Sequence, residues 1–275
     1  MAYVQRCKPL LGTFVDIYIE ADYPDEITLE LSIRAFNAVE RVHKLMGFHS
    51  PESEVSAINR LNPDEPLKIS SETLEVLQLA LELSDITDGL FDICVGASMV
   101  ANRFLPKQDG NASIDLTGNF KDISLDHIEK TITLKQRVCI DLGGIAKGFA
   151  VDQVFKELET ENISQMIVNA GGDLRMLHFC GERVALRPHR GSGSITLKMV
   201  SPALASSANT FSESNRASFI ITPETGHPLE DSRCISIHAL TCMQADALTK
   251  VCFLVKEHQL RDDILEKFEA SLCIN

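Results

Sequence analysis

Residues 141–148 read D-L-G-G-I-A-K-G and lie between an apolar run and a segment with helical periodicity. This pattern predicts a strand that passes through two glycines into a helix. Such a junction leaves backbone N–H groups free, and the positive end of the helix dipole attracts anions. Lys147, one turn into the helix, adds a point charge. The residues therefore suggest a phosphate cradle, although glycines that merely turn the chain beside a solvated Lys147 explain them equally well.

The rest of the chain alternates strand and helix patterns without a linker rich in proline, glycine or serine. We therefore expect one α+β domain over residues 1–275. Strands are predicted at residues 14–19, 131–134, 138–140, 166–168, 183–186, 194–199, 219–222 and 235–240, with a further short strand before a turn near 125–130. Helices are predicted at residues 27–46, 70–87, 244–255 and 259–268, and after Gly144. In the first helix, the core-facing stripe is expected to be Leu29, Ile33, Phe36, Val39 and Val42.

Charge and composition exclude several classes of partner. The chain has a net charge of −13, which disfavours nucleic acid and anionic membranes. The first 25 residues contain charged side chains throughout and no signal-peptide core, and no run of about 18 apolar residues predicts a membrane helix. The eight cysteines include no C-x-x-C pair, so most are expected to be reduced core residues. We expect a cytoplasmic protein.

Seven sequence blocks occur in an order typical of one protein family. The longest is D-L-G-G-I-A-K-G-F-A-V-D at residues 141–152. The others are L-G-T-F at 11–14, S-E-V-S-A-I-N at 53–59, G-L-F-D at 89–92, N-A-G-G-D at 169–173, P-E-T-G at 223–226 and A-D-A-L at 245–248. Together they resemble the ApbE family of flavin transferases, which move FMN from FAD onto a protein threonine or serine. The resemblance implies an ApbE-like domain related to the T-fold, with FAD as substrate and a flavoprotein as acceptor partner.

The resemblance also assigns binding residues. It implies FAD contacts from Leu11, His49, Leu90, Phe91, Asp92, Asp141, Lys147 and Ile220. It implies Mg²⁺ coordination by the Gly144 carbonyl and the Asp246 carboxylate, which are hard oxygen ligands of the kind magnesium prefers. Without the family, Asp246 would be interpreted as a carboxylate favouring a helix N-terminus. No catalytic residue is assigned.

Several positions depart from the family pattern. Residues 219–223 read F-I-I-T-P where the family has H-I-I-D-P, so Phe219 and Thr222 replace a histidine and an aspartate. Residues 207–210, S-A-N-T, replace S-G-D-Y, and His49 and Leu11 replace a tyrosine and a methionine. A phenyl ring cannot accept a proton from an attacking hydroxyl. We therefore expect impaired transfer, with a non-catalytic FAD-binding relative or a ligand-free scaffold as alternatives. His227 is a candidate substitute for the lost histidine, or a plain turn residue.

A further departure concerns the metal. The family pattern D-A-L-x-T places a metal-ligand threonine four positions after the aspartate, and this chain has Lys250 there, with Thr249 one position earlier. An ammonium cannot coordinate magnesium, but it can replace part of the metal's charge beside Asp246. Two outcomes are open. Either Thr249 serves as the metal ligand and Lys250 turns to solvent, or Lys250 pairs with Asp246 and the site is metal-free.

Overall fold

The computed structural model describes residues 1–107, 118–179, 181–186, 195–208, 220–231 and 233–274. Its helices are α1 (Asp25–Met46), α2 (Glu54–Asn59), α3 (Ser71–Ile86), α4 (Gly96–Ala101), α5 (Ala146–Glu157), α6 (Cys242–Leu254) and α7 (His258–Lys267), with short 3₁₀ turns η1 (Ile93–Val95) and η2 (Phe120–Asp122). The strands are β1 (Ala2–Leu10), β2 (Thr13–Ala21), β3 (Leu67–Lys68), β4 (Ile123–Asp126), β5 (Thr131–Leu134), β6 (Ile163–Ala170), β7 (Asp173–Leu177), β8 (Arg183–Leu186), β9 (Ile195–Lys198), β10 (Ala203–Ala208), β11 (Ile221–Thr222), β12 (His227–Pro228), β13 (Cys234–Ala239) and β14 (Ser271–Ile274).

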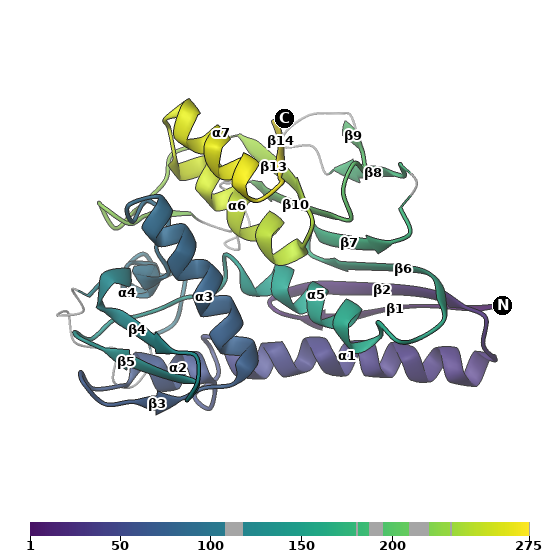
Figure 1. The fold of residues 1–275 in the computed structure, drawn as a ribbon, viewed down its shortest axis with the longest axis horizontal. Coiled ribbons are helices and arrows are strands. Elements are labelled where there is room, and N and C mark those ends of the chain that lie inside the picture. The colour runs from purple at the N-terminus through teal and green to yellow at the C-terminus, as the bar shows by residue number, and fades with distance from the viewer. Residues whose placement is uncertain (108–117, 180, 187–194, 209–219, 232, 275) are drawn as a thin grey trace.

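A seven-stranded sheet organises the larger part of the molecule, in the order β1-β2-β6-β7-β10-β13-β14. Every neighbouring pair in it is antiparallel. Helices α1, α5 and α6 pack against this sheet and against one another (Figure 1). Strand β2 shows the expected alternation, because Val15, Ile17 and Ile19 are fully buried while Phe14, beside them, is 70% exposed. The α+β class is confirmed.

Helix α1 buries a different stripe from the predicted one. Phe36, Val39 and Val42 are buried as expected, but Leu29 and Ile33 lie on the exposed side, so that part of the prediction is wrong. The buried positions in this half of the helix include small residues, among them Thr28, Ser32, Ala35 and Ala38. Small side chains let α1 approach its neighbours closely. Because these residues are only weakly hydrophobic, the apolar periodicity of the sequence does not mark this face as buried.

A smaller region carries α2, α3, α4 and a three-stranded sheet in the order β3-β5-β4, at the left of Figure 1. One hydrophobic cluster includes buried residues of both regions, such as Ile132 of β5 and Phe149 of α5. Ser70 caps α3 by accepting a hydrogen bond from the Thr73 N–H. No helix among the described residues is both long and apolar enough to cross a bilayer.

The predicted strand at residues 138–140 is wrong. Strands β4 and β5, on either side of the Asp126–Thr131 turn, form as expected, but Val138, Cys139 and Ile140 pair with no strand in the described part of the chain. The Asn59 side chain binds both backbone groups of Ile140 instead, donating to its carbonyl at 3.0 Å and accepting from its N–H at 2.7 Å. A buried amide thus replaces a neighbouring strand, and it fixes the segment that leads to Asp141.

We predict that Asn59→Ala lowers the free energy of unfolding by about 1–3 kcal/mol, because it leaves buried backbone groups of Ile140 without partners. Urea denaturation followed by circular dichroism measures the loss. Asn62→Ala is the matched control, since Asn62 is exposed and bonds only to Glu65 on the surface, and it should change stability by less than about 0.5 kcal/mol. Equal losses in the two variants would contradict the anchoring role of Asn59.

Candidate functional site

A cavity of about 320 Å³ opens between the small region and the helices α5 and α6. Its lining combines the β1–β2 turn, the end of α1, the α4 segment, the glycine stretch before α5 and residues of α6. Among the predicted FAD contacts, the lining includes Leu11, His49, Phe91, Asp92, Asp141, Lys147 and Ile220. Leu90 is partly buried in the core behind the cavity and is not among the lining residues. Sequence reasoning therefore brought together residues from five distant segments.

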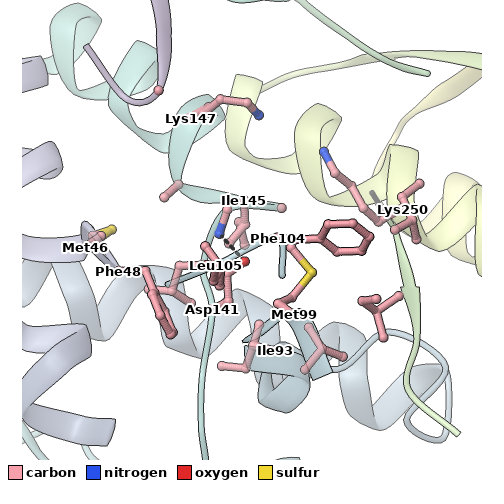
Figure 2. A pocket seen from close by; sticks show the side chains of 18 of the residues that line it. Met46, Phe48, Ile93, Met99, Phe104, Leu105, Asp141, Ile145, Lys147 and Lys250 are labelled. Carbon is pink, nitrogen blue, oxygen red and sulfur yellow. Dashed lines mark hydrogen bonds between the residues drawn. The ribbon is translucent and has the colours of Figure 1, made fainter. Parts of the chain in front are cut away.

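The cavity has two chemically different parts. Figure 2 shows the ammonium groups of Lys147 and Lys250 on one side, above a group of apolar side chains that includes Met99, Phe104 and Ile93. Lys147 extends from α5 and Lys250 from α6, so the cationic side is formed where these helices meet. The arrangement fits a ligand that carries both anionic groups and a flat apolar body.

The turn between β1 and β2 reaches the cavity with an unusual backbone. Leu11 and Gly12 have φ angles of 55° and 72°, the left-handed pair that a two-residue hairpin of type I′ requires. Glycine adopts this conformation freely, whereas leucine does so at a cost of order 1 kcal/mol. A strained residue at the edge of a cavity is common at ligand sites, and the hairpin register places Leu11 there.

The carboxylates of Asp141 and Asp92 accept hydrogen bonds from nearby backbone N–H groups and so stabilise local turns. The Asp141 carboxylate accepts a hydrogen bond from the Gly143 N–H at 3.1 Å and shapes the glycine turn. Burial raises the pKa of Asp141, and this N–H together with the charges of His49 and Lys147 opposes the rise. Asp92 caps the η1 turn through the Cys94 N–H at 2.8 Å, and burial raises its pKa as well. Both residues nevertheless line the cavity.

Lys147 lies between two buried carboxylates. Its ammonium is 2.6 Å from Asp173 and 3.2 Å from Asp246, and these side chains are 2% and 0% exposed. Burial alone would lower the pKa of Lys147, but the two aspartates outweigh burial and raise it above its ordinary value. The lysine is therefore charged, and its predicted position at the start of the helix is confirmed.

Lys250 pairs with Asp246 and does not turn to solvent. Its ammonium contacts the Asp246 carboxylate directly and donates to the Asp246 main-chain carbonyl at 3.0 Å. Thr249, fully buried, donates its hydroxyl hydrogen to the same carbonyl at 2.7 Å and lies 2.8 Å from the Ser207 hydroxyl. Of the two arrangements expected for this turn of α6, the structure contains the lysine pair.

The two aspartates of this cluster differ in acidity. Burial would raise the pKa of Asp246, but Lys147, Lys250 and the Gly148 N–H at 3.1 Å outweigh burial and hold it at about 2. Asp173 has a raised pKa, because burial and the negative charge of Asp246 outweigh the attraction of Lys147. Asp246 is therefore the ionised centre of the cluster, with an ammonium on either side.

The residues present do not fit magnesium. Lys250 is close to both implied ligand positions: its ammonium pairs with Asp246, and its stem would lie 3.6–3.8 Å from a Cβ placed on Gly144. A divalent cation near Lys250 would also be repelled, by about 4 kcal/mol per unit charge at about 4 Å in a partly buried site. We therefore assign no chemical step to a metal.

Sequence reasoning missed several lining residues. Met99, Phe104 and Leu105 come from and just after α4, a segment in which nothing in the pattern signalled a ligand. Asp173 is the last residue of the N-A-G-G-D block, and nothing in its sequence position indicates that its carboxylate contacts Lys147. The departures at Phe219, Asn209 and Thr210 lie outside the described residues.

Comparisons with known proteins agree on one family. A model of the ApbE family matches residues 11–271. The chain is 29% identical to the FAD:protein FMN transferase of Vibrio cholerae, over 93% of this chain and 82% of the relative, and 28% identical to that of Chlamydia pneumoniae, over 88% and 79%. The crystal structure of the ApbE protein from Thermotoga maritima superposes with a TM-score of 0.84 at 26% identity, covering 99% of this chain and 94% of the other.

We predict that Asp246→Asn lowers the free energy of unfolding by about 3–5 kcal/mol, because it leaves two lysines beside a neutral group in a buried site. Asp88→Asn is the control, since the Asp88–Lys121 pair is exposed and asparagine tolerates the positive φ of residue 88. That change should cost no more than about 1 kcal/mol. Urea denaturation measures the free energy of unfolding of both variants. A decrease for Asp246→Asn as small as that for Asp88→Asn would contradict the interpretation of Asp246 as the centre of a buried charge cluster.

Proposed function

This chain belongs to the ApbE family, and we propose that it is a FAD:protein FMN transferase that attaches FMN to a threonine or serine of a partner flavoprotein. The observation that carries the proposal is the two-part cavity, in which the ammonium of Lys147 lies beside apolar walls. FAD has the same two parts, a diphosphate and a flat, largely apolar ring system. The relatives from Vibrio cholerae and Chlamydia pneumoniae are FAD:protein FMN transferases by name, which supports the same assignment.

The glycine stretch supports a diphosphate position. Gly143, Gly144 and Lys147 all line the cavity, and α5 begins at Ala146. The N–H groups of Ile145 and Ala146 donate to the Leu142 carbonyl, and the Gly148 N–H donates to Asp246. The start of α5 therefore offers an anion its positive dipole end and the Lys147 ammonium. We infer that the diphosphate lies against residues 143–147 and that the flavin ring lies among Phe91, Met99 and Phe104.

The reaction consists of one phosphoryl-group substitution. The hydroxyl oxygen of the acceptor forms a bond to the phosphorus of the FMN half, the bond from that phosphorus to the bridging oxygen breaks, and AMP leaves with that oxygen. The hydroxyl proton passes to a base or to water. Lys147 beside the phosphates would stabilise the charge that develops on the leaving AMP. Transfer to the partner protein is checked by the mass gain of one FMN moiety on an acceptor used by a relative.

A non-catalytic FAD-binding protein is the second candidate, and the sequence at residues 219–223 favours it. Ile220 and Ile221 line the cavity, so this segment borders the ligand. The family's histidine and aspartate are replaced here by Phe219 and Thr222, of which only Thr222 lies in the described residues. Flavin bound without mass gain on any acceptor would support this candidate over the transferase.

We predict that Lys147→Ala weakens FAD binding by about 1.5–3 kcal/mol, which is the usual value of a hydrogen bond to a charged group. Isothermal titration calorimetry measures the change. Lys156→Ala, on the same helix and with its side chain 67% exposed, is the control and should leave the affinity unchanged. An unaltered affinity in a folded Lys147→Ala protein would exclude the diphosphate contact.

We predict that Phe219→His combined with Thr222→Asp raises the rate of FMN transfer, because a positioned acid or base typically contributes about 10²–10⁴-fold. Single-turnover mass spectrometry of the acceptor gives the rate. Phe219→Leu combined with Thr222→Asn is the matched control, which alters both positions without supplying a proton-transfer group. A wild-type rate equal to that of a relative carrying both family residues would contradict the expectation of impairment.

A further inference from the structure

The Lys250 side chain lies beside both positions expected to hold a metal. It lies four positions after Asp246 in α6, so both side chains are on one helix face. Its stem crosses the open side of Gly144, where an added Cβ would meet carbons of Lys250 at 3.6–3.8 Å. The side chain therefore spans from α6 to the glycine stretch and ends at the Asp246 carboxylate.

The oxygens of Asp246 are already engaged. One carboxylate oxygen contacts Lys250 and lies 3.4 Å from Lys147, and the other accepts from the Gly148 N–H at 3.1 Å and from Lys147 at 3.2 Å. The main-chain carbonyl accepts from Lys250 at 3.0 Å and from Thr249 at 2.7 Å. Magnesium requires about six oxygens in a near-ideal octahedron, so it would have to displace an ammonium and break this arrangement.

The cluster supplies positive charge without a metal. Lys147 and Lys250 both pair with the ionised Asp246, and Lys147 also contacts Asp173, whose pKa is raised. Both lysines also line the cavity, and Lys250 keeps 12% of its side chain exposed there. An ammonium binds phosphate as a point charge, so each lysine can meet an anion while it stays paired behind.

We propose that the Lys250 ammonium stands in for a divalent cation between Gly144 and Asp246, so that this protein holds the diphosphate of its ligand with two lysines and without magnesium. The identity of the ligand as FAD rests on the proposed function. The metal independence rests on the placement of Lys250 alone.

The first test compares FAD binding in EDTA with binding in millimolar MgCl₂, by calorimetry. Wild-type protein should give dissociation constants that agree within about twofold. Lys250→Thr restores an oxygen and removes the competing charge, so it should bind at least about tenfold more weakly in EDTA and recover in MgCl₂. Lys250→Met keeps the stem without oxygen or charge, and it should be weak under both conditions. Lys256→Thr, at an exposed position after α6, should behave as wild type.

The second test omits FAD. MgCl₂ titrated into the ligand-free wild-type protein should produce no binding heat and no rise in melting temperature, whereas Lys250→Thr should show both. If the Lys250 variants do not fold, the two wild-type measurements still decide. If wild type binds no FAD under either condition, the proposed function fails, and the MgCl₂ titration alone tests the role of Lys250. Magnesium binding to ligand-free wild type, or FAD affinity improved tenfold by MgCl₂, would overturn the proposal.

Discussion

The buried carboxylate of Asp246 connects the two helices on which the candidate site depends. It belongs to α6, yet it accepts a hydrogen bond from the Gly148 N–H in α5 and attracts Lys147 one residue earlier. The same carboxylate holds Lys250 on its own helix. A buried charge of this kind is costly unless every partner is in place, so the position of one lysine depends on the position of the other. The cationic side of the cavity is therefore one cooperative unit.

The close approach of the helices makes that unit possible. A Cβ on Gly148 would lie only 2.2 Å from the Cys242 carbonyl, so α5 and the start of α6 meet through backbone atoms. On the far side of this contact, Asp152 accepts hydrogen bonds from the Cys242 and Met243 N–H groups at 3.0 Å and 2.8 Å. Gly148 allows the close backbone contact, and Asp152 binds the first N–H groups of α6. Together they hold α5 and α6 close enough for Asp246 to reach α5.

Local patterns predicted much of this architecture, and tertiary contacts explain where they failed. The helix predicted after Gly144 forms as α5, because glycine placement and periodicity are properties of neighbouring residues. The segment at 138–140 was predicted as a strand because its side chains are apolar. Its backbone partner is the distant Asn59 amide, which no local pattern encodes.

In the candidate site, too, local sequence signals were informative and tertiary contacts were not predicted. The resemblance assigned Asp141, Lys147 and Asp246, which lie in separate sequence blocks, to one ligand site. In the structure Asp141 and Lys147 line the cavity, and Asp246 contacts Lys147. The ion pair between Lys147 and Asp173 joins α5 to the start of β7, and its geometry depends on how the sheet packs against the helix. The choice between Thr249 and Lys250 was open in sequence, since both offsets from Asp246 lie near one helix face. Burial decided it, because the Thr249 hydroxyl faces Ser207 of β10 while Lys250 reaches the cavity.

An ammonium in place of a divalent cation would affect the binding of the anionic ligand and the rate of FMN transfer differently. Under the proposal, the positive charge on Lys250, which is paired with Asp246, would act together with Lys147 to hold an anionic ligand. Rate acceleration requires more, since only charge that interacts more strongly with the transition state than with the bound ligand lowers the barrier. A single ammonium supplies half the formal charge of a divalent ion. Under the proposed function, the departures at Lys250, Phe219 and Thr222 would act in the same direction. Each removes a group that would assist the departure of AMP or the loss of the hydroxyl proton, and none removes the Lys147 ammonium that the proposal places at the diphosphate.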